Sequence, residues 1–143
     1  MNAKQYCTFY LDNNFLGIAV TDVQEVLKYQ HMTSVPLSTE VVRGLINLRG
    51  QIVTALDLRK VMGLETLSDR LPMNIVVRGD DGPLSLLVDE IGDVVEVETD
   101  LFEDPPETLE ISFRHLIRGV YKLEGKLMLV LDLERAVFSL VDA

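Results

Sequence analysis

Apolar and β-branched residues occur along this chain in short runs that are separated by turn-forming residues. The clearest runs are Val42–Leu48 and Ile52–Leu58, which flank Arg49 and Gly50. Glycine readily adopts the positive φ that a tight hairpin turn requires, and runs of β-forming residues bounded by such a turn are typical of paired strands. The pattern therefore predicts an antiparallel hairpin with Arg49 at its apex.

The pattern of this hairpin returns 75 residues later in the chain. The repeated features are the Arg-Gly pairs Arg43-Gly44 and Arg118-Gly119, the turn glycines Gly50 and Gly125, and the Leu-Asp-Leu triplets Leu56–Leu58 and Leu131–Leu133. A shorter motif, Val20–Val26, returns as Val88–Val94 at a spacing of 68 residues. We infer two copies of one β unit, which differ at the turn because Glu124 occupies the place of Arg49.

Other runs complete each copy. The predicted elements are a hairpin of Tyr6–Leu11 with Phe15–Val20, a helical turn at Thr21–Gln24, a strand at about Glu25–Tyr29, a short helix at Asp57–Met62, and a second-copy hairpin of Met73–Val77 with Leu84–Val88. About five short strands per copy favour small barrels over a flat sheet. We expect a mostly β fold of two tandem five-stranded barrels with short helices. They would form a single domain over residues 1–143, with a first barrel at about 15–70, a second at about 73–140, and the strand 6–11 and the connecting segments completing them.

The formal net charge of the chain is −10, and the surplus of acid lies in its second half. Residues 1–71 hold seven Asp and Glu against seven Lys and Arg, whereas residues 72–143 hold sixteen against six. Nucleic acids and anionic lipids are bound through neutralisation of phosphates by Lys and Arg, so both are poor partners for this chain. A basic or mixed-charge protein partner is favoured.

The chain offers little for metal or cofactor chemistry. Cys7 is its single cysteine and lies in an apolar run, so an intrachain disulfide is excluded and a small core residue is expected. His31 and His115 have no Cys or His at ligand spacing. We expect no cofactor and no metal. Because no apolar run reaches the ~18 residues of a membrane span and the N-terminus lacks a signal-peptide core, we expect a cytosolic protein without direct membrane insertion.

The run Val42–Arg59, which contains Asn-Leu-Arg-Gly at Asn47–Gly50, resembles the CheW family of adaptors. The resemblance extends from Tyr6 to about Val141 and includes a Val-x-Glu-Val motif at Val23–Val26. It implies two SH3-like β-barrel subdomains, no catalytic activity and two partners in bacterial chemotaxis. These are the regulatory domain of a CheA-type histidine kinase, contacted barrel to barrel, and the cytoplasmic tip of a chemoreceptor in the groove between barrels. A paralogue that serves another CheA-type system, such as twitching or gliding motility, is the alternative.

The resemblance also implies which residues contact partners. Arg49 matches the receptor-coupling arginine of the family, Val23 and Glu25 match the Val-x-Glu positions, and Ile75 and Val94 match apolar contact positions in the second copy. From the sequence pattern alone, the apolar residues Val23, Val26, Ile91 and Val94 are either core residues or the floor of a groove that receives a helix.

Asp57 and Asp132 are the residues that suggest an enzyme, since each occupies the same place in one copy, as in a duplicated aspartic protease. Such enzymes carry Thr or Ser and then Gly after the aspartate, whereas each aspartate here is followed by Leu and a charged residue. Capping of the following helix is therefore favoured over an acid hydrolase. The recurrence of Arg43 and Arg118 in both copies predicts a structural pairing with a neighbouring carboxylate.

Overall fold

The structure is a computed structural model that describes residues 2–36, 40–67 and 69–142. Its first five strands are β1 (Ala3–Leu11), β2 (Asn14–Ala19), β3 (Val23–Leu27), β4 (Val42–Leu48) and β5 (Gln51–Asp57). The next five are β6 (Met73–Gly79), β7 (Gly82–Val88), β8 (Glu90–Glu98), β9 (Ile117–Leu123) and β10 (Lys126–Leu131). The helices are α1 (Leu58–Val61), α2 (Ile111–Arg114) and α3 (Leu133–Asp142), with 3₁₀ turns η1 (Val20–Asp22) and η2 (Thr99–Leu101). The fold is mostly β, as predicted.

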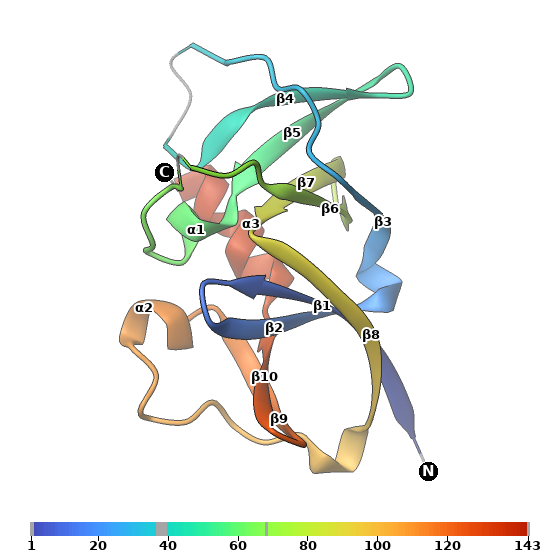
Figure 1. Ribbon diagram of the computed structural model, residues 1–143, viewed down its shortest axis with the longest axis vertical. Helices are drawn as coiled ribbons and strands as arrows, with labels where there is room; N and C mark the ends of the chain where they lie inside the picture. The colour runs from blue at the N-terminus through green and yellow to red at the C-terminus, as the bar shows by residue number, and fades with distance from the viewer. Residues whose placement is uncertain (1, 37–39, 68, 143) are drawn as a thin grey trace.

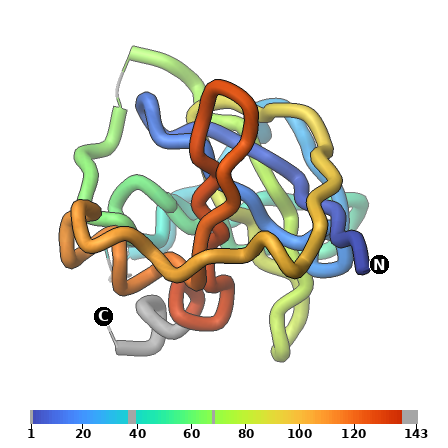
Figure 2. Tube along the Cα trace, turned by 90° about the horizontal axis from the view of Figure 1, so that it is seen from below, coloured from blue at the N-terminus to red at the C-terminus, as the bar shows by residue number. Residues whose placement is uncertain are grey.

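The strands form two five-stranded sheets that exchange strands between the two copies of the repeat. Sheet A has the order β8-β1-β2-β10-β9 and sheet B the order β3-β6-β7-β5-β4, so each sheet joins the first hairpin of one copy to the last three strands of the other. Within each sheet, strands of the two copies are joined by parallel pairing, of β2 with β10 in sheet A and of β5 with β7 in sheet B. Figure 2 shows the hairpin of β9 and β10, in orange to red, lying against the N-terminal hairpin.

The predicted division into a first barrel at about 15–70 and a second at about 73–140 is therefore wrong. The two hairpins of the first copy were predicted correctly, but they lie in different sheets. The physical reason is that η1 carries the chain from sheet A to sheet B after β2, and Asp89 carries it back after β7. Each copy thus crosses the seam between the sheets once.

A short backbone bridge closes each sheet into a barrel-like unit. The chain that follows β3 pairs through Thr33 with Leu45 of β4, with N···O distances of 2.9 and 2.8 Å. The chain that follows β8 pairs in the same way through Glu103 with Val120 of β9, at 3.0 and 2.8 Å. Because each segment leaves the strand at one edge of its sheet and bonds the strand at the other edge, the sheet closes on itself.

The repeated Arg-Gly pair has a packing explanation at these bridges. A Cβ atom on Gly44 would lie 2.6 Å from the Thr33 carbonyl oxygen, and a Cβ atom on Gly119 would lie 2.6 Å from that of Glu103. Both separations are well inside van der Waals contact. Glycine is therefore required at the same place in both copies because the bridging backbone passes directly over it.

The predicted roles of the repeated Arg and Asp residues are confirmed. Arg43 Nη1 lies 3.5 Å from Asp57 Oδ2, and Arg118 Nη2 lies 3.6 Å from Asp132 Oδ1. Each aspartate also accepts a hydrogen bond from the backbone of the helix that it precedes, at 3.0 Å from Arg59 N and 3.1 Å from Arg135 N. The two aspartates therefore cap α1 and α3 and hold one arginine each.

The largest apolar cluster spans both sheets and fills the seam between them. It includes Phe9, Leu11, Leu16 and Ile18 from sheet A and Leu56, Ile75, Val77 and Leu86 from sheet B. A smaller cluster lies within each sheet, around Tyr6 and Met128 in sheet A and around Ile46 and Val53 in sheet B. Because the main core is shared, the sheets are two parts of one folding unit.

Candidate partner-binding surface

Arg49 lies at the apex of the β4–β5 hairpin, as predicted. Leu48 pairs with Gln51, so the turn consists of Arg49 and Gly50, whose φ angles are 53° and 88°. Two successive positive φ angles define the tight turn that matches the twist of a hairpin. Asn47 Oδ1 supports the turn by accepting a hydrogen bond from Gly50 N at 2.9 Å. A non-glycine residue held in the left-handed region is uncommon, and the Arg49 side chain projects with 68% of its surface exposed.

Arg49 forms an ion pair with Glu25 on β3, through Nη2 and Oε2. The Glu25 side chain is only 20% exposed, so the guanidinium covers a half-buried carboxylate. The pair joins the hairpin tip to the strand at the opposite edge of sheet B. The structure therefore brings together two of the residues that the sequence singled out from separate motifs.

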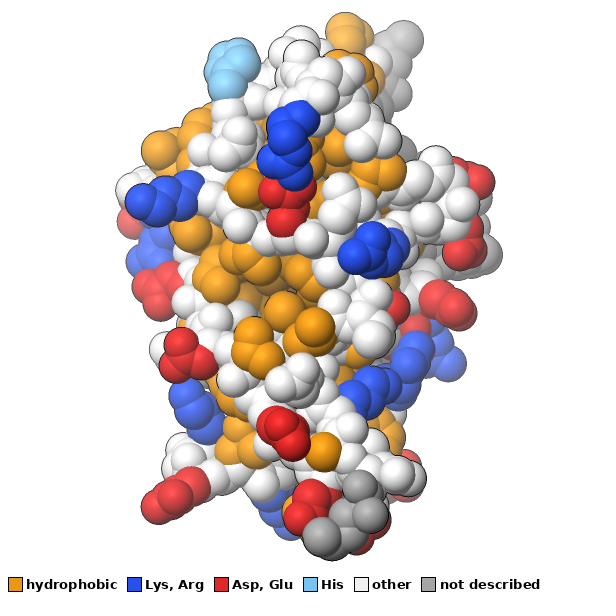
Figure 3. All heavy atoms as spheres, turned by 90° about the vertical axis from the view of Figure 1, so that its right-hand side faces the viewer, with side chains coloured by type: hydrophobic (Ala, Val, Ile, Leu, Met, Phe, Trp, Pro, Cys, Tyr) orange, Lys and Arg blue, Asp and Glu red, His pale blue; other side chains and the backbone are white. Residues whose placement is uncertain are grey.

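β3 and β8 are the terminal strands of sheets B and A, and both lie on the right-hand side of the molecule in Figure 1. Figure 3 faces that side and shows apolar side chains gathered over a hollow in its centre, with charged side chains around it. Val26 of β3 is 39% exposed and Val94 of β8 is 56% exposed, and these two valines occupy equivalent places in the repeat. We call the surface formed by β3 and β8 the edge-strand groove.

The four apolar candidates named from the sequence divide between the core and the floor of the groove. Val23 and Ile91 are partly buried and pack against the main apolar cluster. Val26 and Val94 are exposed. Since these are two pairs of repeat equivalents, each copy contributes one residue to the core and one to the groove, and Val94 is accessible to a partner as the sequence suggested.

Ile75 was predicted to contact a partner, and this prediction is wrong. Its side chain is completely buried in the main apolar cluster, on the inner strand β6, where it pairs with Val26. Its neighbour Val76 is also completely buried, in the smaller cluster of sheet B. Both faces of β6 are covered from Asn74 to Val77, so a side chain in this part of the strand stabilises the seam and does not reach the surface.

Ile52 is an exposed apolar residue that the sequence reasoning missed. It lies on β5 opposite Asn47, one pair from the Arg49 turn, and is 61% exposed. The alternation along the strand contained the signal, because Val53 is completely buried and its neighbour must then point outward. The hairpin tip thus presents an apolar side chain close to its arginine.

Among the described residues, Asp57 and Asp132 do not meet as a pair of catalytic carboxylates. Asp57 and Asp132 lie at the ends of strands of different sheets, and each is engaged by an arginine and a helix backbone. The hollow beside Arg43, Asp57 and Arg59 measures about 20 Å³, room for about one water molecule. Burial raises the pKa of the Cys7 thiol, which disfavours the thiolate nucleophile. No group of three or more His, Cys, Asp or Glu within the described residues could hold a metal ion.

Burial and a hydrogen bond with Tyr121 raise the pKa of the Tyr6 hydroxyl, so Tyr6 stays neutral in the smaller apolar cluster of sheet A. Across the described parts of the chain, no helix is both long and apolar enough to cross a lipid bilayer.

Comparison with known proteins gives consistent matches over nearly the whole chain. Residues 5–140 match the family model described as CheW-like domain. Chemotaxis protein CheW of Thermotoga maritima is 28% identical over 132 residues, which cover 91% of this chain and 85% of that protein. Protein PilI of Pseudomonas aeruginosa is 28% identical over 117 residues, covering 81% of this chain and 66% of that protein. The crystal structure of scaffolding protein TtCheW from Thermoanaerobacter tengcongensis superposes with a TM-score of 0.80 and 26% identity, covering 92% of this chain and 85% of that one.

Proposed function

This chain belongs to the CheW-like domain family, and we propose that it is a non-catalytic adaptor that couples chemoreceptors to a CheA-type histidine kinase in bacterial chemotaxis. Its likeness to a chemotaxis protein over most of both chains supports the coupling role. The likeness to a protein described as a scaffold supports a role in assembly.

The observation that carries the proposal is the ion pair of Arg49 with Glu25 beside the edge-strand groove. A two-residue turn holds the guanidinium at a fixed place, and its forked N–H groups can bind a carboxylate or a backbone carbonyl of a partner. The exposed Val26 and Val94 offer apolar contact to the same partner. An apolar groove with a charged rim suits an amphipathic helix, which is the form that the hairpin tip of a receptor presents.

In this scheme Arg49, Glu25 and Val94 contact the receptor tip, and Val23 supports β3 from the core side. The regulatory domain of the kinase is the second partner, bound by barrel-to-barrel contact. The adaptor then acts by position, since it places the kinase beside the receptor and makes or breaks no covalent bond. We place it in the cytoplasm, at the inner face of the membrane where receptor tips lie.

The substitution Arg49→Asp tests the proposal. Aspartate tolerates the left-handed conformation better than most residues, so the turn is retained while the charge at its apex is reversed. We expect binding to a receptor hairpin tip to weaken by about tenfold or more, since a charge-assisted contact is worth roughly 1.5–3 kcal/mol. Binding is measured by titration calorimetry, and the melting temperature is measured in parallel.

The matched control is Arg78→Asp, which makes the same charge change at an exposed position at the end of β6 in sheet B. It should leave binding within about twofold of the wild type. Equal loss of binding in the two variants would mean that net charge alone matters and would refute a specific role of Arg49. A large drop in melting temperature for Arg49→Asp would assign Arg49 to the fold instead.

The alternative is a paralogue that serves another CheA-type system, such as twitching or gliding motility. The match to Protein PilI, a relative that does not carry the chemotaxis name, favours this alternative. Affinity for the regulatory domains of each CheA-type kinase of the same organism separates the two, because an adaptor should bind the kinase of its own array more tightly than the others.

A further inference from the structure

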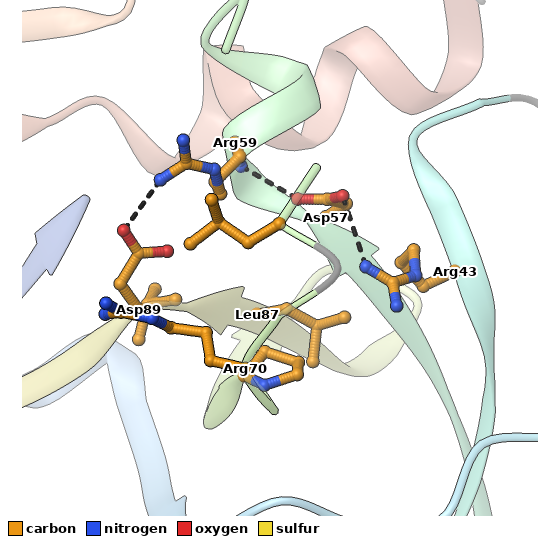
Figure 4. Close-up of a pocket in the computed structure, with 9 residues that line it drawn as sticks. Arg43, Asp57, Arg59, Arg70, Leu87 and Asp89 are labelled. Atoms are coloured by element: carbon orange, nitrogen blue, oxygen red, sulfur yellow. Dashed lines mark hydrogen bonds and ion pairs between the residues drawn. The ribbon is translucent and has the colours of Figure 1, made fainter. Parts of the chain in front are cut away.

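A buried arginine connects the two sheets on the side of the seam away from the edge-strand groove. Arg59, 7% exposed, lies in α1 directly after β5 of sheet B. Its Nη1 lies 2.7 Å from Asp12 Oδ1 and 2.7 Å from Asp89 Oδ2, and its Nε donates a hydrogen bond of 2.6 Å to the Glu65 carbonyl oxygen. Figure 4 shows the Arg59 guanidinium and the Asp89 carboxylate facing each other. We call Arg59, Asp12 and Asp89 the seam clamp.

The two carboxylates come from elements that the clamp must hold together. Asp12 belongs to the turn between β1 and β2 of sheet A, and Asp89 is the single residue between β7 of sheet B and β8 of sheet A. They are also joined directly, since Asp12 N donates to Asp89 Oδ2 at 2.7 Å and Asp89 N donates to the Tyr10 carbonyl oxygen at 3.1 Å. The arginine therefore ties sheet B both to a loop of sheet A and to the point where the chain crosses between sheets.

The hydrogen bonds between Arg59 and the two carboxylates of the seam clamp join oppositely charged groups. Burial acts to lower the pKa of Arg59, but the hydrogen bonds and charges of Asp12 and Asp89 outweigh it and raise that pKa. Charge-assisted hydrogen bonds are shorter and stronger than neutral ones, and the forked guanidinium fixes their direction. Arg59 and Asp89 are both almost fully buried, so loss of either partner would leave a charge in the interior.

The other crossing between the sheets has no such clamp. At the repeat-equivalent places Glu134 stands where Arg59 does and Thr21 where Asp89 does. In the part of the chain that the structure describes, neither side chain takes part in an ion pair. One crossing is thus held by buried charges, whereas at the other no residue of η1 is buried.

The position of the clamp relative to the groove suggests its role. In Figure 1, α1 and the turn between β1 and β2 lie on the left of the seam, whereas β3 and β8 lie on the right. A contact that holds two bodies together on one side sets how far they open on the other. We propose that the seam clamp fixes the angle between sheets A and B and thereby the width of the edge-strand groove, which makes Arg59 a positioning residue for a partner that it does not touch.

The angle can be measured without any partner. In a Cys7→Ser background, spin labels at Gln51→Cys in sheet B and Lys122→Cys in sheet A report the separation of the two sheets, and labels at Gln5→Cys and Lys122→Cys report sheet A alone. We expect Arg59→Met to broaden or shift the distance distribution of the first pair and to leave that of the second pair unchanged. The control Arg118→Met removes an arginine that is paired within sheet A, and both distributions should stay at their wild-type values.

Asp12→Asn provides a milder variant if Arg59→Met does not fold. Asp12 has a half-exposed side chain, and asparagine keeps its shape and its acceptor oxygen while losing the charge. We expect a smaller change of the same inter-sheet distance. Wild-type distributions for a folded Arg59→Met or for Asp12→Asn would overturn the proposal.

The effect on binding rests on the proposed function and has its own readout. If loosening leaves the binding-competent angle occupied one-tenth of the time, the affinity for a receptor hairpin tip falls about tenfold. Altered distances with unchanged affinity would overturn the link between clamp and groove. If the wild-type protein does not bind the receptor tip at all, the proposed function fails, whereas the distance measurement still decides whether Arg59 sets the angle.

Discussion

The hairpin of β4 and β5 and the hairpin of β9 and β10 begin with the same Arg-Gly pair and end in the same Leu-Asp-Leu triplet. Inside the fold the two hairpins have the same roles. In each, the glycine makes room for a backbone bridge and the aspartate caps the following helix. At the tip they diverge, because Arg49 pairs with Glu25 whereas Glu124 occupies the second tip. They diverge again after the triplet, where Arg59 is buried and Glu134 is exposed.

The comparison separates two kinds of residue in a duplicated chain. Among the positions that recur in both copies are the glycine and the aspartate that the closed sheet requires, whichever copy supplies the strand, and also the exposed valines of the edge-strand groove. The tip that we propose binds a partner and the seam clamp are instead found at positions that differ between the copies. Differences between the repeats therefore mark where one copy has a contact that the other lacks.

Alanine at the bridge glycines should have the largest effect on stability. We expect Gly44→Ala to cost about 2–3 kcal/mol, because the added Cβ meets backbone oxygen at 2.6 Å, and Gly119→Ala to cost at least as much, because its Cβ also meets Phe102 Cζ. Urea denaturation measures the loss. The control is Gly125→Ala, where nothing lies within 4 Å of the new Cβ and only the φ of 81° is unfavourable, for about 1 kcal/mol. A cost at Gly44 no larger than that of the control would contradict the crowding argument.

The two capping aspartates should differ in how much stability is lost when each is replaced by alanine. Asp57 is almost fully buried and also accepts a hydrogen bond from Thr66 Oγ1 at 2.5 Å, whereas the Asp132 side chain is 17% exposed. We expect Asp57→Ala to cost about 2 kcal/mol and Asp132→Ala about 1 kcal/mol, the usual value of a cap. Thermal unfolding compares the two variants under the same conditions. The reverse order would show that α3 depends on its cap more than the buried network depends on Asp57.

Exchange of the tip charges should change stability little and binding most selectively. Glu124→Arg should change the free energy of unfolding by less than about 0.5 kcal/mol, whereas Arg49→Glu removes the ion pair with Glu25 and should cost about 1 kcal/mol. Titration with a receptor tip should show weaker binding for Arg49→Glu alone. Equal effects of the two substitutions on binding would mean that the tips are equivalent in use as well as in shape.

The local elements could be predicted from the sequence because their signals are local. The turn at Arg49 and Gly50, the hairpin through Asp12, and the caps at Asp57 and Asp132 each depend on a few neighbouring residues. The pairing of Arg43 and Arg118 with carboxylates followed from their recurrence in both copies. η1 and β3 begin one to two residues before the predicted helical turn and strand, as expected where one element passes directly into another.

The exchange of strands could not be predicted from the same signals. The two copies have the same strand pattern, so the edge of β2 fits beside β5 or β10 equally well by sequence, and only packing across the seam selects β10. Ile75 was wrongly predicted to contact a partner for a related reason. The inner strand β6 and the edge strand β8 both carry apolar residues, so the sequence does not show which of their side chains are buried. α2 was missed because its N-cap residue Glu110 makes no side-chain capping bond.

The exchanged strands impose an order on how this chain can acquire its structure. The sheet that begins with β1 is finished only when β9 and β10 exist, so its closing contacts join opposite ends of the polypeptide. Contacts between residues so distant in the sequence form slowly, because a long loop must close before any of them is made. Sheet B is built from residues 23–88 alone, so its strands can pair while the rest of the chain is still being synthesised, whereas the hairpin of β1 and β2 must wait for β8, β9 and β10.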